Sequence, residues 1–263
     1  FEPHMGKPLC EVPSLDGKAE NFAEYFGQEF EQVIRELGFT PEFIRSREHY
    51  RKGFYNDAIR TALQNADKIR DIYRRVSGSA KDVEWLPLSV VCEKCGKVGT
   101  TKVIAFDGEK VTYICEPEMV PWARGCGYSG TTSPFDGRAK LPWKVEWAAK
   151  FKIFGVKVEG AGKDHSTKGG AREVADAISR EVYGYEPPYD IPYEFFNVGG
   201  RKMSASKGAG ASAREVADLL PPQVLRLLML HKEPKDVTDF LPDGDTIPNL
   251  YDLYDKMAEH YFE

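Results

Sequence analysis

The chain contains 263 residues, of which 41% are hydrophobic and 29% are charged, and its formal net charge at pH 7 is −5. This length allows two domains with a hydrophobic core in each, and the composition is that of an ordinary globular protein. The negative charge excludes an overall attraction to nucleic acid or to an anionic membrane, and the sequence shows neither a signal peptide nor an apolar run of the roughly 20 residues that a membrane span needs.

The first part of the chain is predicted to be mainly helical. Apolar residues at helical spacing run from residue 18 to residue 37, Gly38 ends this helix, and the segment "FTPEFIRS" at 39–46 favours a short strand. A second helix is predicted over residues 56–76. Residues 87–130 contain short strand-like runs broken by Gly, Pro and Cys, which indicates a small inserted module.

Helix and strand patterns alternate in the middle of the chain. The predicted order is a helix at 143–155, a strand at 156–159, a glycine-containing loop at 160–165, a helix at 171–183 and a strand at 193–198. The succession of strand, loop, helix and strand favours βαβ units in a parallel sheet.

The last part of the chain returns to helical patterns. Ser212 and Glu215 form a capping-box pair that predicts the start of a helix. The segment "PPQVLRLLML" at 221–230 predicts a helix with Pro in its first turn, and residues 249–263 carry an apolar stripe at helical spacing.

Four of the five cysteines predict a metal site. Cys92 and Cys95 form a C-x2-C pair, and Cys115 and Cys126 follow across a hairpin-like segment. Four thiolates suit tetrahedral Zn²⁺ and leave no position for water, which favours a structural role; the alternative is four reduced core cysteines. Cysteines used in this way indicate a reducing compartment, so the cytoplasm is the expected location.

Two further segments are weaker signals. "EGAGKDH" at 159–165 follows a predicted strand and precedes a helix, where an open α/β sheet binds ligands, although Gly-rich turns of this kind are also common without function. "WKVEW" at 143–147 offers a carboxylate and two aromatic faces to a cationic group. Its alternative interpretation is core packing plus a surface acid.

The segment "GGRKMSASKG" at 199–208 combines glycines, hydroxyls and ammonium groups. Such a loop suits a polyphosphate, because lysines supply charge, hydroxyls donate hydrogen bonds and glycines allow close backbone approach. A solvated hairpin turn is the alternative.

Together these segments resemble one family. "KMSASKG" at 202–208 resembles the KMSKS loop of class I aminoacyl-tRNA synthetases, in the form typical of class I lysyl-tRNA synthetases. The resemblance continues in the same order through "HMGKPLCEVPSLDG" at 4–17, the cysteine module, the W-x-x-D/E-W and GKDH elements, "PQVLRLL" and "NLYDLYD".

The resemblance implies a Rossmann-like parallel-sheet nucleotide-binding fold of the α/β class, with an inserted zinc-ribbon module and the start of a C-terminal helical domain. The implied division places the first part of the catalytic domain with a helical connective region in 1–86, the zinc ribbon in 87–140, the second half of the catalytic domain in 141–232 and the helical domain from 233 to 263.

The implied reaction joins lysine to ATP as lysyl-adenylate and then transfers lysine to tRNA(Lys), with Mg²⁺ accompanying the ATP. No membrane contact is implied. On this resemblance the phosphates of ATP are held by Lys202, Ser204, Ser206 and Lys207. The rest of the ATP site is assigned to Gly162, Asp164, His165 and Met203, and the site for the lysine substrate to Trp143, Glu146 and His165.

The sequence also departs from the family pattern. Ala205 replaces the second lysine of KMSKS, Glu146 stands where Asp is usual, and ten residues separate Cys115 from Cys126. No HIGH motif is present, because "PHMG" at 3–6 runs directly into the "KPL" segment. We therefore expect a fragment that is inactive alone. Two alternatives stay open: a non-catalytic synthetase-derived paralogue that binds tRNA or protein, and an enzyme for another amino acid, which the carboxylate of Glu146 disfavours.

Overall fold

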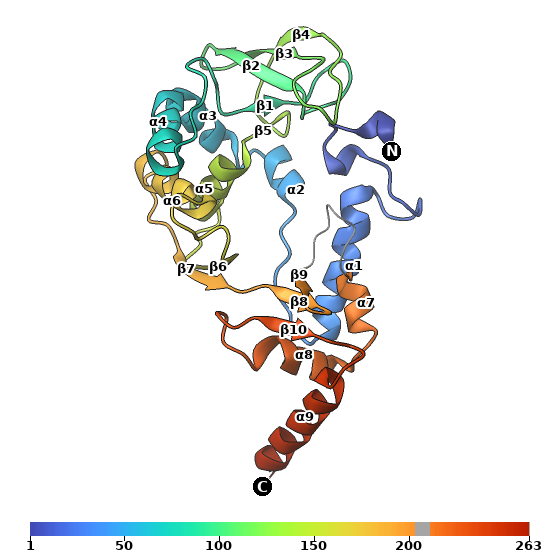
Figure 1. Cartoon of the computed structure of the whole chain (residues 1–263). Helices are drawn as coiled ribbons and strands as arrows, with labels where there is room; N and C mark the ends of the chain where they lie inside the picture. The colour runs from blue at the N-terminus through green and yellow to red at the C-terminus, as the bar shows by residue number, and fades with distance from the viewer. Residues whose placement is uncertain (203–210, 263) are drawn as a thin grey trace. The chain divides into compact units, whose positions relative to one another are not determined.

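The computed structural model describes residues 1–202 and 211–262, and Figure 1 shows the order of their helices and strands. The chain divides into two compact units, each with a buried core of its own. The first unit comprises residues Phe1–Glu24, Ile44–Glu159 and Asp164–Asp190, and the second comprises Tyr25–Phe43, Gly160–Lys163 and Ile191–Glu263. Within the described residues, no helix combines the length and the apolar character that crossing a membrane requires.

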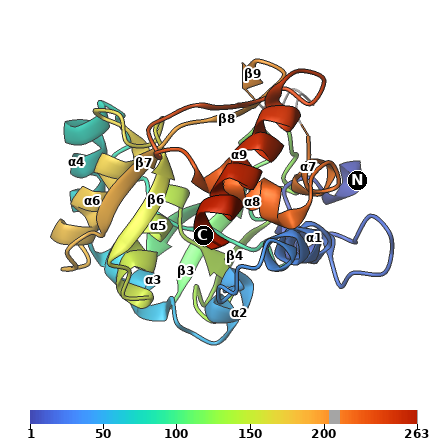
Figure 2. The same cartoon turned by 90° about the horizontal axis from the view of Figure 1, so that it is seen from below.

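Helices build most of the first unit's core. They are α2 (Ser46–Arg51), α3 (Asn56–Gln64), α4 (Ala66–Ser77), α5 (Trp143–Ile153) and α6 (Ala171–Glu181), preceded by two short 3-10 turns at Glu2–His4 and Leu9–Glu11. Helix α6 packs against α5 and α4, and Figure 2 shows α4 and α6 side by side. Ile69, Phe151 and Ile178 are almost fully buried among these helices. The apolar faces of α3, α4 and α6 therefore meet in a shared core, whereas α5 is buried on several sides.

The helix predicted over residues 56–76 is two helices in the structure. The break lies at Asn65, whose ψ of 27° departs from helical geometry, and its side-chain amide donates a 2.8 Å hydrogen bond to the Thr61 carbonyl. Asn competes in this way with backbone hydrogen bonding and favours helix ends. The one-helix prediction was wrong at this residue.

The strand-like runs of the cysteine-containing segment form two small antiparallel sheets. The first pairs β1 (Ser89–Val90) with β5 (Ala139–Lys140). The second has the order β2-β3-β4, with β2 at Thr101–Phe106, β3 at Val111–Cys115 and β4 at Ser129–Thr132. Alternate residues of β3 are buried, as expected for a sheet packed on one face.

A further two-stranded sheet joins β6 (Val158–Gly162) and β7 (Tyr189–Tyr193). The predicted strand at 156–159 therefore starts later and includes the "GAG" that was predicted to be a loop. The β7 strand was not predicted, because Pro192 lies within it and weakens the strand pattern.

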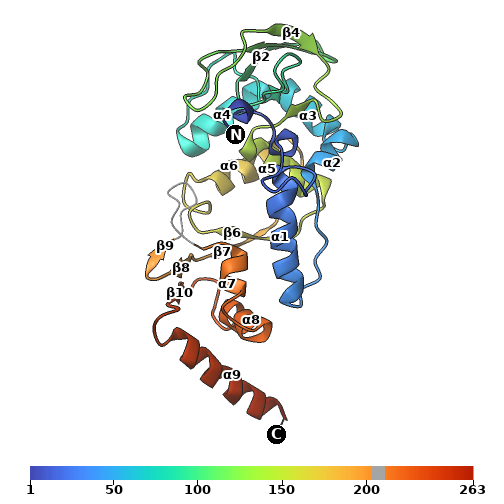
Figure 3. The ribbon, with the colours of Figure 1, turned by 90° about the vertical axis from the view of Figure 1, so that its right-hand side faces the viewer.

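The second unit packs its helices against a short mixed sheet. Helix α8 (Pro222–Leu230) and strand β10 (Thr238–Phe240) meet α1 (Phe22–Glu36) through buried Val33, Leu225 and Phe240. Figure 3 shows α8 and α1 in this arrangement, with α7 (Ala213–Ala217) beside them.

The sheet order in this unit is β10-β8-β9. Strand β8 (Phe196–Val198) runs parallel to β10 and antiparallel to β9 (Arg201–Lys202). The predicted capping box is confirmed, since the Ser212 hydroxyl accepts from the Glu215 N–H and the Glu215 carboxylate accepts from the Ser212 N–H. The predicted C-terminal helix is α9 (Thr246–Phe262).

Two expectations about strands differ from the structure. Residues 39–45 form neither helix nor strand, so the strand predicted at 39–46 was wrong; Pro41 removes a backbone N–H donor at its centre. The described sheets contain two or three strands each, with β8 and β10 as a parallel pair among them. The architecture is therefore a mixed α/β one, without the extended parallel sheet among the described residues.

Candidate functional site

The four predicted metal ligands come together. The sulfur atoms of Cys92, Cys95, Cys115 and Cys126 all lie within 4.8 Å of one another, with 3.6 Å between Cys92 and Cys126 and 3.7 Å between Cys95 and Cys115. A tetrahedral thiolate site with metal–sulfur bonds of about 2.3 Å requires sulfur atoms about 3.8 Å apart. The cluster therefore has the dimensions of a four-thiolate metal site.

The first two ligands are placed by a tight turn. The Gly96 N–H donates to the Cys92 carbonyl at 2.8 Å, and the Cys92 N–H donates to the Lys97 carbonyl at 2.9 Å. Gly96 has a φ of +71°, a conformation that side chains other than Gly rarely adopt. The turn directs both sulfur atoms to one centre.

The last two ligands are placed by the closing of the loop between them. The Gly127 N–H donates to the Cys115 carbonyl at 2.9 Å, and the Cys115 N–H donates to the Tyr128 carbonyl at 2.8 Å. A Cβ at Gly125 would lie 2.2 Å from the Glu116 carbonyl oxygen, so only Gly allows the two ends of the loop to approach this closely. Cys126 therefore reaches the cluster despite its wide spacing from Cys115.

Hydrogen bonds and burial set the protonation of the thiols. Burial raises the pKa of Cys92, and raises that of Cys95 to about 12. Burial also raises the pKa of Cys126, but hydrogen bonds from the Tyr128 backbone N–H and the neighbouring thiols outweigh this effect and lower the pKa to about 7. The Thr100 hydroxyl lies 3.3 Å from the Cys115 sulfur. The Tyr128 backbone N–H and the neighbouring thiols thus favour the thiolate form of Cys126, and a bound cation favours the thiolate form of the others.

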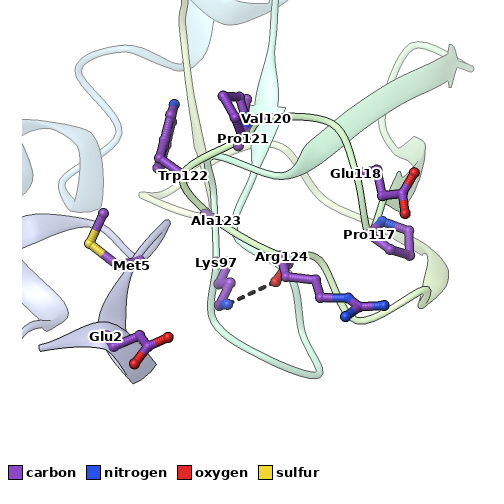
Figure 4. A pocket seen from close by; sticks show the side chains of 10 residues that line it. All are labelled: Glu2, Met5, Lys97, Pro117, Glu118, Val120, Pro121, Trp122, Ala123 and Arg124. Carbon is purple, nitrogen blue, oxygen red and sulfur yellow. Dashed lines mark hydrogen bonds between the residues drawn. The ribbon is translucent and has the colours of Figure 1, made fainter.

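The loop between Cys115 and Cys126 also lines an open cavity of about 570 Å³ together with the N-terminal segment. Figure 4 shows Trp122, Lys97 and Arg124 around it, with the Lys97 ammonium group donating to the Arg124 carbonyl at 2.8 Å. The Trp122 ring covers Gly99, where a Cβ would lie 2.6 Å from it. The Val98 and Gly99 N–H groups both donate to the Gly6 carbonyl. The loop and the first residues of the chain therefore brace the cysteine cluster.

A second candidate site is aromatic. Trp143 and Trp147 stack on α5 with ring centroids 5.7 Å apart and planes 12° from parallel, because they are four residues apart on one helix face. The His165 ring lies edge-on to both, at 5.3 Å from Trp143 and 6.0 Å from Trp147. The structure thus brings together the predicted residues Trp143 and His165, and leaves 55% of Trp143 exposed.

A buried arginine, Arg172, lies next to the Trp147 ring of this aromatic cluster. Arg172 is 2% exposed and makes ion pairs with Glu159, Asp176 and Asp190 at distances of 3.0, 2.8 and 3.1 Å. The Glu159 carboxylate also accepts from the Trp147 indole N–H, at 3.0 Å to one oxygen and 3.1 Å to the other. One cation and three carboxylates leave a formal excess of two negative charges beside the stacked tryptophans.

Glu146 lies in a different environment. Its side chain is 6% exposed and is paired with the ammonium groups of Lys140 and Lys150, the latter at 3.1 Å. This cluster carries a formal excess of one positive charge. The structure therefore does not bring Glu146 together with the face that Trp143 and His165 form.

The remaining predicted residues are distributed as follows. Gly162 ends β6, and the Asp164 carbonyl accepts from the Thr167 hydroxyl at 3.3 Å. The backbone N–H of Arg172 donates to the His165 backbone carbonyl at 3.0 Å. Lys202 ends β9, with its ammonium group 3.5 Å from the centre of the Phe195 ring. Met203, Ser204, Ser206 and Lys207 lie outside the described residues.

Sequence reasoning missed Arg172, Glu159 and Phe195. A signal existed for Arg172, since it lies beside the apolar positions Ala171 and Ala175 at the start of the predicted helix, where a buried charge demands partners. Glu159 and Phe195 carried no such signal, because their partners come from other elements of the fold.

Comparison with known proteins gives a consistent result. A family model described as tRNA synthetases class I (K) matches residues 1–263. Lysine–tRNA ligase 1 of Methanosarcina acetivorans is 41% identical over 266 residues, covering all of this chain and 48% of that protein. The lysine–tRNA ligases of Methanocaldococcus jannaschii and Archaeoglobus fulgidus are 38% and 33% identical, again over the whole chain and over 48% and 51% of their own lengths. The chain spans about half the length of the curated relatives it matches.

Proposed function

Because the chain belongs to the class I (K) tRNA synthetase family, we propose that the protein containing it activates L-lysine with ATP and transfers the lysyl group to tRNA(Lys). The observation that carries this proposal is the similarity of the whole chain to proteins named lysine–tRNA ligase. The geometry adds chemical support, because an aromatic cluster beside excess negative charge suits a cationic amino acid.

The lysine side chain is proposed to bind against Trp143 and His165. The half-exposed Trp143 ring offers a face to an ammonium group, and the neighbouring carboxylates of Glu159, Asp176 and Asp190 supply a favourable field. The sequence had favoured Glu146 for this role. The charges favour Glu159, since Glu146 is already neutralised by Lys140 and Lys150.

The ATP site is proposed to use the two glycine-containing segments. Gly162, Asp164 and His165 would contact the adenosine and aminoacyl groups, with Met203 beside them. Lys202, Ser204, Ser206 and Lys207 would hold the phosphates, together with Mg²⁺. In the reaction, a lysine carboxylate oxygen attacks the α-phosphorus of ATP, a bond to that phosphorus forms, and pyrophosphate leaves. Negative charge gathers on the phosphate oxygens, and ammonium groups stabilise it most strongly in the transition state.

The cysteine cluster is proposed to hold structural Zn²⁺. Four thiolates complete a tetrahedral shell, so Cys92, Cys95, Cys115 and Cys126 would bind the ion without leaving a position for substrate. The metal would fix the turn after Cys92 and the closing of the loop before Cys126. Its contribution would be to folding of this module.

Several finer assignments belong to the same proposal. The catalytic domain would have a Rossmann-like parallel sheet, divided into the ranges 1–86 and 141–232, with the zinc ribbon at 87–140 and a helical domain from 233. The protein would work in the cytoplasm with tRNA(Lys). The family membership supports these assignments as expectations.

The test is amino-acid-dependent exchange between ATP and pyrophosphate. It should be run with all twenty amino acids on the full-length natural protein that contains these residues, with its zinc content measured. Exchange with lysine alone is expected. Exchange with another amino acid would refute the lysine assignment, and silence from a folded, zinc-loaded protein would favour the non-catalytic paralogue.

Two matched variants identify the carboxylate that recognises lysine. We expect Glu159→Gln to raise the KM for lysine about tenfold, because a neutral amide removes one negative charge beside Trp147. Glu146→Gln is expected to change the KM less than twofold. The reverse order would return the role to Glu146.

A further inference from the structure

One aromatic ring in the second unit has two lysines from separate segments within cation–π distance. The Lys202 ammonium nitrogen is 3.5 Å from the centre of the Phe195 ring, and the Lys163 ammonium nitrogen is 5.1 Å from the same centre. The two nitrogens are therefore less than about 9 Å apart. Lys163 belongs to the GKDH element and Lys202 is the first lysine of "KMSASKG". Both segments were singled out as candidate nucleotide-binding loops.

The position of the ring is fixed on both sides by backbone hydrogen bonds. The Thr238 N–H donates to the Phe195 carbonyl at 3.3 Å, and the Glu194 N–H donates to the Pro234 carbonyl at 2.8 Å. Phe195 also directly precedes β8, which pairs with both β9 and β10. The ring is thus attached to the centre of the second unit's sheet.

Lys163 is held near the ring by two contacts of its own. Its N–H donates to the Tyr193 carbonyl at 3.0 Å, and its ammonium group lies 2.6 Å from the Glu194 carboxylate, which is 18% exposed. An ammonium group has three N–H donors, so one carboxylate partner does not prevent it from also contacting a phosphate oxygen.

Two ammonium groups this close repel each other, and the negative face of an aromatic ring offsets that repulsion. A polyphosphate carries negative charge along its length, so one molecule can contact both cations at this separation. We propose that Phe195 is a positioning residue that seats the ammonium groups of Lys163 and Lys202 together for the phosphates of ATP, with Lys163 as an additional phosphate-binding residue. This inference rests on the proposed function, because it takes ATP as the ligand.

The first test compares ATP and AMP binding by calorimetry in the full-length protein. Phe195→Leu removes the aromatic face but keeps an apolar side chain, whereas Phe195→Tyr keeps the ring. We expect Phe195→Leu to weaken ATP binding about 5- to 30-fold and to change AMP binding less than twofold, because AMP lacks the outer phosphates. Phe195→Tyr should restore most of the ATP affinity.

The matched control is Phe135→Leu. Phe135 also carries a cation over its ring, with Arg60 at 4.7 Å, but it lies in the first unit and in neither of the proposed nucleotide-binding segments. This variant should bind ATP as the wild type does. Lys163→Met should weaken ATP but not AMP, and adding Phe195→Leu to it should cost less than in the wild type, because the two changes affect one arrangement.

A second test grades the ring's charge without changing its shape. Phenylalanine at 195 is replaced by analogues with one, two and three ring fluorines, which progressively weaken the negative face of the ring. A cation–π role predicts a stepwise loss of ATP affinity across the series. A purely packing role predicts equal affinities, and that result would overturn the proposal.

The outcomes separate this inference from the proposed function. Unchanged ATP binding by Phe195→Leu, or equal losses for ATP and AMP, would refute the positioning role even if the protein exchanges lysine normally. Selective loss of ATP binding in a protein that shows no lysine-dependent exchange would support the role of Phe195 and refute the lysine ligase assignment. Absence of ATP binding by the wild type would overturn both.

Discussion

Replacement of Arg172 by Met tests the buried charge cluster most directly. The guanidinium group is 2% exposed, pairs with Glu159, Asp176 and Asp190, and donates to the Pro188 carbonyl at 2.6 Å. Methionine fills a similar volume but leaves these acceptors without their shared donor. The packing loss should therefore be small, and the electrostatic loss large.

The expected cost is about 3–5 kcal/mol, the range for removing one partner of a buried ion pair. The three carboxylates are only partly exposed, at 28%, 23% and 24% of their side chains, so water compensates them incompletely. Adding the free energies of four separate hydrogen bonds would give a larger cost. These four bonds share the guanidinium group of Arg172, so their contributions are not additive. Arg172→Lys keeps the charge without the forked geometry and should cost less.

The cost should also depend on pH. Burial already raises the pKa of Asp176 above its ordinary value of 3.8. A carboxyl group with a raised pKa in the folded state favours folding while it is protonated, and this contribution is lost as the pH rises through the folded-state pKa. Removing Arg172 raises that pKa further. The variant should therefore be more destabilised at about pH 7.5 than at about pH 5.

Hydrogen–deuterium exchange of peptides from α5 and α6 measures the local opening free energy. The matched control is Arg74→Met on α4, whose partner Asp71 is 48% exposed; it should change this free energy by less than about 0.5 kcal/mol. A loss of less than about 1 kcal/mol for Arg172→Met at pH 7.5, or a larger loss at pH 5 than at pH 7.5, would refute the reasoning.

Three further changes address the metal and aromatic sites. Cys126→Ser should reduce bound zinc, measured by mass spectrometry of the native protein, well below one ion per chain, and undiminished zinc would show that Cys126 is not a ligand. Thr100→Val removes the hydroxyl beside Cys115 and should weaken zinc affinity about tenfold in a chelator competition, whereas unchanged affinity would mean that this contact is incidental. Trp143→Ala should raise the KM for lysine about tenfold with little change in kcat, and an equal loss in both would argue against a binding role.

Sequence signals predicted the structure correctly where the interacting residues are close together in the chain. Ser212 and Glu215 satisfy each other's backbone within four residues, and the helix begins there as expected. The Cys92 turn similarly depends on neighbouring residues and on Gly96. The break at Asn65 is also local, but the continuous apolar stripe on either side of it concealed the signal.

Contacts between distant segments were much harder to predict. The assignment of Glu146 to the lysine site rested on the resemblance and on the two neighbouring tryptophans, and its ion pair with Lys140, at the end of β5, had no sequence signal. Arg172 collects carboxylates from β6, α6 and β7, an arrangement that exists only after those elements have packed. Spacing in the sequence therefore indicated which residues could bind a ligand, but it did not indicate which side chains those residues pair with in the fold.

The backbone hydrogen bonds that join the two ends of the 116–125 loop affect how much the length of this loop can change. Because Cys115 bonds to Gly127 and Tyr128 through its backbone, the two ends of the loop are joined independently of what lies between them. Lengthening a loop whose ends are already joined costs little entropy, since that cost grows only with the logarithm of loop length. Evolution, or an engineer inserting a peptide tag near Glu118, can thus change the length of this segment while the ligand geometry is kept.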